Sequence, residues 1–558
     1  MKMSKLKVNL LLLLLTIPSF VLLFTNKGFS FHDETQIVNL HQYVKAFNFG
    51  QFPPRWAPDM HFTYGSPYLE FNYQLPYYLG VLFNKIGFSL LNSYKLCLAT
   101  SLLLGAFGIF YFASQITSLL IGFAAVLLYT YLPYRAVDVY VRGTVGESFA
   151  LGIYPWILYT MFRLKRDGSL INIIFFSLSV AGLILSHQPS TLLGLPFIVG
   201  IFILSELLSK SFKSIKKLFI GLGLSVAVSS YYLVPVLLEK KYIQDVIPFN
   251  FYDHFPFIKQ LIYSKWGYGS SNWGPYDDMS FQLGFSAIFV VVIATLFLIF
   301  KFRSIKNKSI LSYLVFSLIS FIFVMFLMNV RSSFFWQIFP YTNSIQFPWR
   351  LLSVSAILSS LIFIFLATLL KGKYQKIIVF VVIALSLASL GYFHPGTIVE
   401  HKDDYYLRRY LPNQVLFSGE DVSADYLDYT ENYIPLPKNA VRPNKMPSAK
   451  INSYNKLTEI NADFSNPYHI TATLNAKSWD IIGVNNFYYP GWEIKIDNKT
   501  IATTLDNNGA MLVEIGEGVH QLTVDYHETP IRQLSNIISL ASLILMTLFI
   551  IRSRFNHG

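Results

Sequence analysis

Long apolar runs separated by polar segments dominate the chain up to residue 393, and one more run lies near its end. A helix needs about 20 mostly apolar residues to cross a bilayer, and twelve runs reach that length or nearly so. They lie near residues 8–25, 96–113, 116–133, 147–162, 170–186, 190–205, 218–238, 281–300, 309–330, 351–370, 377–393 and 533–551. The pattern predicts a polytopic α-helical membrane protein with a transmembrane domain over 1–393 and a final helix and tail over 533–558.

The polar region between these parts, residues 394–532, changes character along its length. Residues 394–465 have little periodicity and many Asn, Asp, Lys and Pro residues, which predicts irregular loops. Over 466–530, apolar and polar positions alternate in short runs separated by turn signals, which predicts a small antiparallel β-sandwich. The expected strands are 468–474, 481–489, 492–496, 510–515 and 519–526.

The amino-acid composition agrees with a membrane protein. The 558 residues are 53% hydrophobic and only 13% charged, which is too apolar for a soluble protein of this size. The single cysteine, Cys97, lies inside an apolar run. It excludes an internal disulfide framework and a cysteine-based zinc site.

Basic residues set the expected orientation, because cytoplasmic loops of membrane proteins are enriched in Lys and Arg. With the N-terminus inside, the inner loops hold 19 of the 44 basic residues and two acidic ones, Asp167 and Glu206. The remaining 25 basic and 29 acidic residues give the rest of the chain a net charge of −4. The total of +13 therefore reflects membrane topology and not a nucleic-acid surface. We expect a multi-pass protein of the cell (plasma) membrane with both termini cytoplasmic, and with the long loop 26–95 and the region 394–532 outside.

The first apolar run follows three lysines between residues 2 and 7, as the apolar part of a secretory signal does. Its exit, residues 24–27, offers no cleavage site of the small-x-small type. We therefore expect an uncleaved first helix.

Two carboxylates, Asp33 and Glu34, directly follow this first helix. They stand at the membrane boundary, where a lipid-borne substrate presents its headgroup. A carboxylate there can deprotonate an acceptor hydroxyl or hold a divalent cation such as Mg²⁺ or Mn²⁺. The alternative interpretation is an ordinary polar helix exit.

Arginines stand in two further outer segments. Arg55 lies in a loop with four prolines between residues 53 and 67, which forbid a regular helix, and its guanidinium can bind a phosphate through two N–H groups. The alternative is a snorkelling arginine in an aromatic belt. Arg142 and Glu147 border a helix start rich in small residues, which lets a ligand approach the backbone. Here the alternative is a structural i,i+4 ion pair between Asp138 and Arg142.

Two outer turns add further candidates. His187 lies in a tight turn between two helices, where a hydrogen-bonded turn residue is the more common role and a substrate contact is the alternative. Gln346 and Arg350 belong to a motif that leads into a helix, and Pro348 near a helix start is structurally ordinary. The positive-inside rule does not explain Arg350 on the outer side, whereas an anionic lipid phosphate does.

All these residues are expected on the same side of the membrane, and this is a stronger signal than any one of them. Transfer from a phosphate-linked donor requires arginines that stabilise the departing phosphate and a carboxylate that activates the acceptor. The candidates at the predicted outer face are Asp33, Glu34, Arg55, Arg142, Glu147, His187, Gln346 and Arg350.

The chain also resembles known families. An aspartate just after the first helix, a long outer loop and about a dozen helices resemble the GT-C superfamily of membrane glycosyltransferases. Several motifs resemble a bacterial family described as membrane protein, 6-pyruvoyl-tetrahydropterin synthase-related, and the C-terminal part resembles the end of YfhO-like membrane proteins. The first set of motifs is 51–56, 64–67, 142–147, 186–189 and 346–350, and the second is 488–492, 518–520 and Tyr526.

The resemblance implies an inverting GT-C-type glycosyltransferase, with a polyprenyl-phosphate-sugar donor and a cell-envelope acceptor outside the cytoplasm. It implies that Asp33 is the base or acceptor-orienting carboxylate, assisted by Glu34 or Glu147, and that Arg142 and Arg350 hold the donor phosphate. The pterin-synthase label is not taken as chemistry, because such an enzyme needs a soluble fold, a three-histidine zinc site and a cysteine.

A non-catalytic membrane protein is the alternative. A lipid or polysaccharide transporter is expected to place ionisable residues at mid-bilayer, often in repeated halves, and the helix centres here are nearly free of them and show no repeat. An envelope assembly scaffold that keeps the fold without catalysis is the other form of this alternative.

Overall fold

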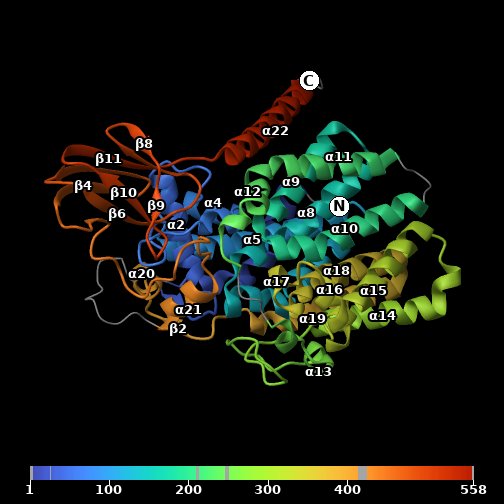
Figure 1. Cartoon of the computed structure of the whole chain (residues 1–558). Helices are drawn as coiled ribbons and strands as arrows, with labels where there is room; N and C mark the ends of the chain where they lie inside the picture. The colour runs from blue at the N-terminus through green and yellow to red at the C-terminus, as the bar shows by residue number, and fades with distance from the viewer. Residues whose placement is uncertain (1–3, 26, 209–212, 246–249, 412–423, 556–558) are drawn as a thin grey trace.

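The computed structural model describes residues 4–25, 27–208, 213–245, 250–411 and 424–555. A body of packed helices lies beside a β-sheet region, and the C-terminal helix α22 runs from that region past α12 and α11 (Figure 1). The predicted class, a polytopic helical protein with a β-sandwich-like region near the C-terminus, is confirmed. Some predicted features lie outside the described residues, namely Lys2, Asn26, Lys210, part of the polar region at 412–423 and the tail at 556–558.

Most helices of the body coincide with the predicted apolar runs. The helices are α1 (Lys5–Thr16), α2 (Thr35–Asn48), α3 (Tyr68–Phe71), α4 (Leu75–Lys85), α5 (Leu90–Ser114), α6 (Leu119–Thr130), α7 (Pro133–Ala136), α8 (Val145–Arg166), α9 (Leu170–Ser186), α10 (Gln188–Leu208), α11 (Lys213–Val228), α12 (Ser230–Leu238), α13 (Ile258–Ile262), α14 (Phe285–Lys301), α15 (Lys308–Leu327), α16 (Ser333–Ile338), α17 (Thr342–Ile345), α18 (Leu352–Leu369), α19 (Gly372–Ala388), α20 (Asp403–Tyr410), α21 (Ala424–Asn432) and α22 (Pro530–Phe555).

Within the described residues, seven helices are long and apolar enough to cross a membrane, or nine if each of two bent pairs forms one span. One pair joins α6 to the segment Pro133–Arg142 at an angle of 53°, and the other joins α11 to α12 at 73°. The first bend precedes Pro133, whose ring cannot continue the hydrogen-bond ladder of α6. The number of twelve spans stays a prediction.

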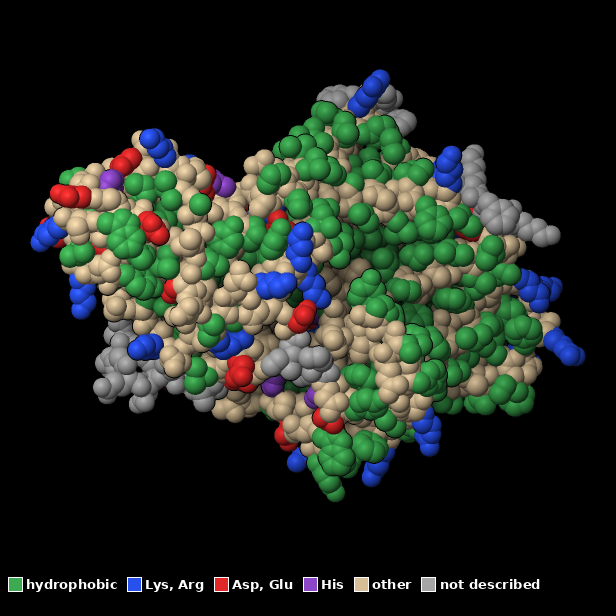
Figure 2. Space-filling model, viewed as in Figure 1, with side chains coloured by type: hydrophobic (Ala, Val, Ile, Leu, Met, Phe, Trp, Pro, Cys, Tyr) green, Lys and Arg blue, Asp and Glu red, His purple; other side chains and the backbone are tan. Residues whose placement is uncertain are grey.

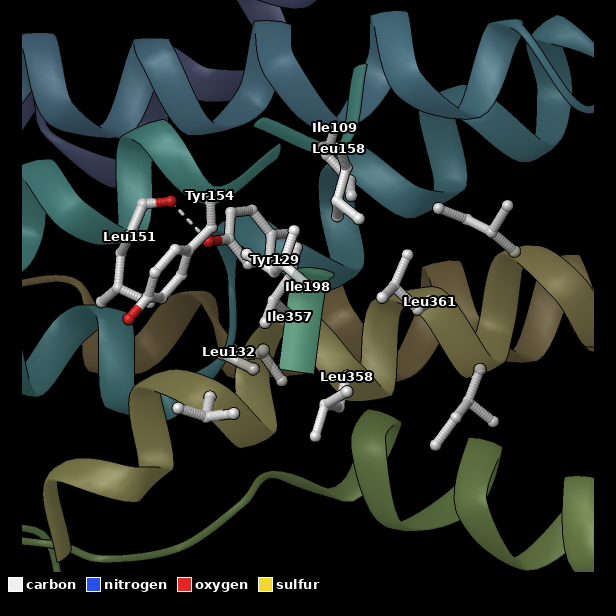
Figure 3. Packing of buried hydrophobic residues seen from close by; sticks show 14 of the residues in the cluster. Ile109, Tyr129, Leu132, Leu151, Tyr154, Leu158, Ile198, Ile357, Leu358 and Leu361 are labelled. Carbon is white, nitrogen blue, oxygen red and sulfur yellow. Dashed lines mark hydrogen bonds between the residues drawn. The ribbon is translucent and has the colours of Figure 1, made fainter. Parts of the chain in front are cut away.

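Helix α18 lies at the centre of the helical body. Its residues 352–367 are all buried, and it packs against α6, α14 and α15. Its serine hydroxyls donate to carbonyl oxygens one turn back, which satisfies them and leaves small side chains that neighbouring helices approach closely. Figure 3 shows Leu358 and Leu361 of this helix among aliphatic side chains from its neighbours, and the Tyr129 hydroxyl donating to the carbonyl oxygen of Leu151.

Two antiparallel sheets, in the orders β3-β6-β10-β9 and β4-β5-β11-β7-β8, form the β-sheet region. Alternate side chains of the strands, such as Ile470, Leu474, Val484 and Val513, are buried in one shared apolar core. The strands are β3 (Ile451–Ser453), β4 (Thr458–Asn466), β5 (His469–Ala476), β6 (Asp480–Phe487), β7 (Trp492–Ile496), β8 (Lys499–Ile501), β9 (Thr504–Leu505), β10 (Ala510–Ile515) and β11 (Gly518–Tyr526).

The expectation of irregular loops over 394–465 is wrong in part. Helices α20 and α21 fall in this range, and β3 and β4 already belong to the sheets. Strand β4 is an edge strand whose side chains are all exposed or half-buried. It therefore leaves little of the hydrophobic alternation from which a strand is recognised.

A two-stranded sheet links the loop after the first helix to the segment after α19. Strand β1 (Gly28–Phe29) pairs with β2 (Ile398–Val399), and the Ser30 amide donates to the Thr397 carbonyl oxygen at 3.0 Å. This pairing fixes the backbone that leads directly into Asp33.

Candidate functional site

The segment before α8 departs from regular α-helix where the candidate residues begin. Val137–Arg142 forms a π-helical turn, a local distortion frequent at functional sites. The turn ends at Gly143, whose φ of 71° is in the left-handed region. Helix α8 then starts at Val145, so that Arg142 and Glu147 lie on either side of a sharp change in chain direction.

Gly143 lets the loop after the first helix approach this turn. A side chain here would place its Cβ 2.3 Å from both the Phe31 ring and the Tyr94 hydroxyl, so the contact excludes any larger residue. The neighbouring backbones are joined by two hydrogen bonds of 2.8 Å, from the amide of His32 to the carbonyl of Val141 and from Asp33 to Arg142. The aspartate is thereby held against the segment that carries Arg142.

Arg142 and Glu147 form the centre of a buried ion cluster, which we define as Asp138, Arg142, Glu147 and Arg350. Nη1 of Arg142 donates to Asp138 Oδ1 at 2.8 Å and to Glu147 Oε2 at 2.7 Å. The Tyr134 hydroxyl donates to Glu147 Oε1 at 2.5 Å, and Arg350 Nε lies 3.7 Å from Glu147 Oε2. The predicted structural pair of Asp138 and Arg142 is thus present, as one part of a larger cluster. Because burial removes water from these charges, each depends on its partners.

A strained turn positions Arg350. Gln346 has φ 66° and ψ −51°, and the amide of Phe347 donates to the carbonyl oxygen of Ile345 at 2.8 Å, which together define a classic γ-turn. The same carbonyl oxygen accepts a 2.7 Å hydrogen bond from Arg350 Nη1. Within the described residues, Nε of Arg350 is buried without a hydrogen-bond partner. Backbone strain of this kind concentrates at functional sites.

Asp33 lies at the exposed edge of the cluster. Its side chain is 28% exposed, and His32 Nδ1 lies 2.9 Å from Oδ1. Burial raises the pKa of this carboxyl, but the hydrogen bond with His32 and the charges of His32, Arg142 and Arg350 lower it more, so that the net shift is downward. Asp33 is therefore an ionised, partly open carboxylate beside buried arginines.

His187 faces the same cluster from the turn between α9 and α10. Its Nδ1 accepts the amide hydrogen of Ser190 at 3.3 Å and lies 2.7 Å from the Ser190 hydroxyl, so the ring caps α10. Its ring packs edge-on against Tyr73, with the ring centroids 5.8 Å apart. Burial, together with the charge of Arg350, lowers its pKa to about 3, which keeps the imidazole neutral. The predicted role of a hydrogen-bonded turn residue fits these contacts.

Two predicted site residues have partners elsewhere. Glu34 accepts a 3.0 Å hydrogen bond from Arg409 of α20, which ties the loop to the polar region. Arg55 is fully buried and donates to Glu528, to Asn536 and to the backbone carbonyl of Tyr231. Its guanidinium joins the first loop to α12 and α22, and these partners occupy the N–H groups that a phosphate would need.

Sequence reasoning missed two aromatic members of the site. Tyr134 binds Glu147, and no sequence signal marked it. The centroid of the Trp349 ring lies 4.7 Å from the Arg142 guanidinium carbon, and the ring stacks on Phe347. Its place next to Arg350 in the motif 346–350 is the one feature of the sequence that points to it. A guanidinium over an indole face is stabilised by the ring quadrupole.

The buried ion cluster is not arranged to hold a metal ion. Within the described residues, no group of three His, Cys, Asp or Glu side chains is placed to hold a metal. Asp138 and Glu147 both bind Arg142, so a cation would have to displace a guanidinium. The expectation of a divalent cation stays a prediction that concerns Asp33 and Glu34.

Comparisons with known proteins point to one family. A family profile described as 6-pyruvoyl-tetrahydropterin synthase related domain; membrane protein, matches residues 70–395. An uncharacterized protein of Lactococcus lactis subsp. cremoris is 25% identical over 294 residues, which cover 50% of this chain and 47% of that protein. This chain thus spans about half the length of that relative.

Two solved structures are similar to parts of this chain. The arabinofuranosyltransferase AftD from Mycobacteria is 14% identical, with a TM-score of 0.44 over 74% of this chain and 28% of that one. The Archaeoglobus fulgidus oligosaccharyltransferase in its apo form is 11% identical, with a TM-score of 0.43 over 80% of this chain and 61% of that one.

Proposed function

This chain belongs to the membrane-protein family described as 6-pyruvoyl-tetrahydropterin synthase related, and we propose that it is a GT-C-type glycosyltransferase. It moves a sugar from a polyprenyl-phosphate donor to an acceptor in the cell envelope. The main support is the backbone hydrogen bond between Asp33 and Arg142, because it holds an ionised carboxylate beside the buried ion cluster.

The arginines supply the electrostatic part of this reaction. Arg350 lies at the edge of the ion cluster, with its side chain 11% exposed. Its Nε lies 3.7 Å from Glu147 Oε2 and forms no hydrogen bond among the described residues. This N–H group binds an oxygen of the phosphate in the lipid-linked sugar. Arg142 is held by two carboxylates behind it and fixes Glu147, the partner of Arg350, in place. Donors fixed before the reaction stabilise the negative charge that develops on the leaving phosphate.

Asp33 supplies the proton acceptor. The acceptor hydroxyl oxygen forms a bond to the anomeric carbon while the bond from that carbon to the phosphate oxygen breaks. The electron pair of the broken bond goes to the polyprenyl phosphate, and the hydroxyl proton goes to the Asp33 carboxylate and then to water. A single displacement of this kind inverts the anomeric configuration.

We place the site outside the cytoplasm, at the surface of the cell membrane. The end of the helical body with Asp33 and the β-sheet region is, by the count of basic loop residues, the non-cytoplasmic one, and both termini are cytoplasmic. A lipid-linked donor in the outer leaflet reaches this end with its phosphate at the membrane surface.

Deletion of the gene tests this function. A glycosyltransferase deletion removes one sugar from the cell envelope and leaves its polyprenyl-phosphate-linked form to accumulate, and mass spectrometry detects both. Unchanged envelope sugars and unchanged lipid-linked sugars would instead favour the scaffold. Assay of the purified protein with and without EDTA decides whether Mg²⁺ or Mn²⁺ takes part.

A further inference from the structure

A cavity of about 450 Å³ opens where α12 ends, and three of its lining side chains are basic. We call it the lysine pocket, and its lining residues are Lys240, Lys241, Ile243, Gln244, Asp245 and Lys438. Its three lysines and one aspartate give a formal charge of +2. All three lysines are exposed, and among the described residues none of them forms an ion pair. Lys241 Nζ lies 5.0 Å from the centroid of the Tyr242 ring, and all three lysine side chains are exposed at the lysine pocket.

The lysine pocket lies at the same end of the helical body as the β-sheet region. The Tyr242 ring, next to Lys241, meets the Tyr489 ring of the β-sheet region edge-on, with the ring centroids 6.5 Å apart. Figure 2 shows basic side chains gathered near the middle of the visible face, at the border between this region and the helical body. The positive-inside rule does not explain lysines at this end, so their position needs another reason.

Backbone pairing holds the two sides of the lysine pocket together. Ile243 forms a β-bridge with Pro437, the Gln244 amide donates to the Leu436 carbonyl, and the Lys438 amide donates to the Tyr242 carbonyl, both at 2.9 Å. Lys438 is thereby fixed opposite Lys240 and Lys241, which come from a different segment. This fixed backbone arrangement presents several positive charges to one ligand at the same time.

The lysine pocket is within reach of the candidate site. Tyr433 lies close enough to Asp33 and Arg350 for their charges to act on its hydroxyl. Tyr433 and Lys438 are five positions apart in the sequence, so their Cα atoms lie at most about 18 Å apart. A flexible polymer held at Lys438 therefore has to extend only past Tyr433 to reach the neighbourhood of the candidate site.

We propose that the lysine pocket binds the anionic groups of the acceptor, and that the acceptor is a polyanionic chain with phosphate or carboxylate groups along its length. Lysine binds such groups as a compact point charge with three rotatable donors. The pocket then retains the chain while its terminal hydroxyl meets Asp33. This inference rests on the proposed function for the identity of the acceptor, but the binding itself requires no catalysis.

The test uses the full chain in phosphatidylcholine nanodiscs, with fluorescent linear polyphosphate as the probe and neutral dextran as its uncharged counterpart. The pocket variant combines Lys240→Gln, Lys241→Gln and Lys438→Gln. The control variant combines Lys456→Gln, Lys477→Gln and Lys499→Gln, which remove the same charge from exposed positions of the β-sheet region. We expect the pocket variant to bind polyphosphate about tenfold more weakly, since it loses several charge-assisted contacts. The control variant and Asp33→Asn are expected to bind as the unchanged protein does.

Three results would overturn the proposal. The first is absence of polyphosphate binding, and the second is equally weakened polyphosphate binding in the pocket and control variants. The third is that the pocket substitutions change only the binding of phosphatidylglycerol headgroups in anionic nanodiscs. Because binding is measured without turnover, a failure here is separate from a failure of Asp33→Asn to abolish transfer.

Discussion

The backbone amide of Asp33 donates a 2.8 Å hydrogen bond to the backbone carbonyl oxygen of Arg142. This bond joins the loop after the first helix to the π-helical turn before α8, two segments far apart in the sequence. Through Glu147, Arg142 is connected to Arg350, which lies just before α18. Four separate elements therefore fix the position of one partly open carboxylate relative to two guanidinium groups.

Arg350→Gln is expected to lower the transfer rate about 100-fold, the size of effect seen when one electrostatic donor is removed from an active site. Some loss of stability should accompany this, because Arg350 pairs with the buried Glu147 carboxylate, although Arg142 still holds that carboxylate at 2.7 Å. Arg350→Lys should restore only part of the rate, since an ammonium lacks the planar set of donors. The measurement compares transfer rate and melting temperature with Arg408→Gln, which removes an exposed arginine. A normal rate in Arg350→Gln would show that this arginine does not bind the donor.

Glu147→Gln is expected to destabilise the fold. The substitution leaves two buried guanidinium groups without their shared carboxylate, and breaking a buried ion pair costs about 3–5 kcal/mol. Thermal unfolding in detergent measures the change. Glu459→Gln, at an exposed pair with Lys477, is the control and should change stability by less than about 1 kcal/mol. Equal stability of the two variants would mean that the buried ion cluster does not hold this end of the body together.

Gly143→Ala should disturb the contact between the two backbones. The added methyl group meets the Phe31 ring and the Tyr94 hydroxyl, and the φ of 71° is itself unfavourable for alanine at a cost of about 1–3 kcal/mol. We expect a lower melting temperature together with lower transfer activity. Gly391→Ala, where a Cβ meets no atom within 4 Å, is the matched control and should behave normally. Full activity in Gly143→Ala would show that the close approach is not required.

The pH profile tests the state of Asp33. A carboxyl whose pKa is depressed in the folded protein adds stability above its unfolded value of about 3.9 and loses it as pH falls through the folded value. Since Asp33 must be ionised to accept a proton, transfer should be constant from neutral pH down to about pH 5 and fall only at lower pH. His32→Gln removes the hydrogen bond that helps to lower this pKa, so its acid limb should move to higher pH. An unchanged limb in His32→Gln would exclude Asp33 as the group that titrates.

Much of the fold follows from hydrophobic periodicity. The apolar runs became helices, and the expected strands correspond to β5, β6, β7, β10 and β11 within a few residues. The edge strand β4 escaped prediction because its side chains are all at least partly exposed. The bends at Pro133 and between α11 and α12 are a further reason why the number of apolar runs in the sequence differs from the number of membrane spans.

The candidate site was only partly predictable. Asp33, Arg142, Glu147 and Arg350 lie together because loops at one end of a helical bundle converge, and sidedness is readable from charge counts. Glu34 and Arg55 lie at the same end but serve other contacts. Their partners, Arg409 and Glu528, come from the polar region and from the segment just before α22, and no local spacing reveals a pairing over such separations.

The central claim is tested most directly by Asp33→Asn in a strain that lacks the gene, with the cell-envelope sugars measured at equal protein level. Asp404→Asn, an exposed aspartate of α20, is the matched control. We predict that Asp33→Asn leaves the envelope without the sugar that this protein adds, as in the deletion strain, and that Asp404→Asn restores it. Normal envelope glycosylation in Asp33→Asn would contradict the account, because the account assigns the acceptor's proton to the ionised Asp33 carboxylate.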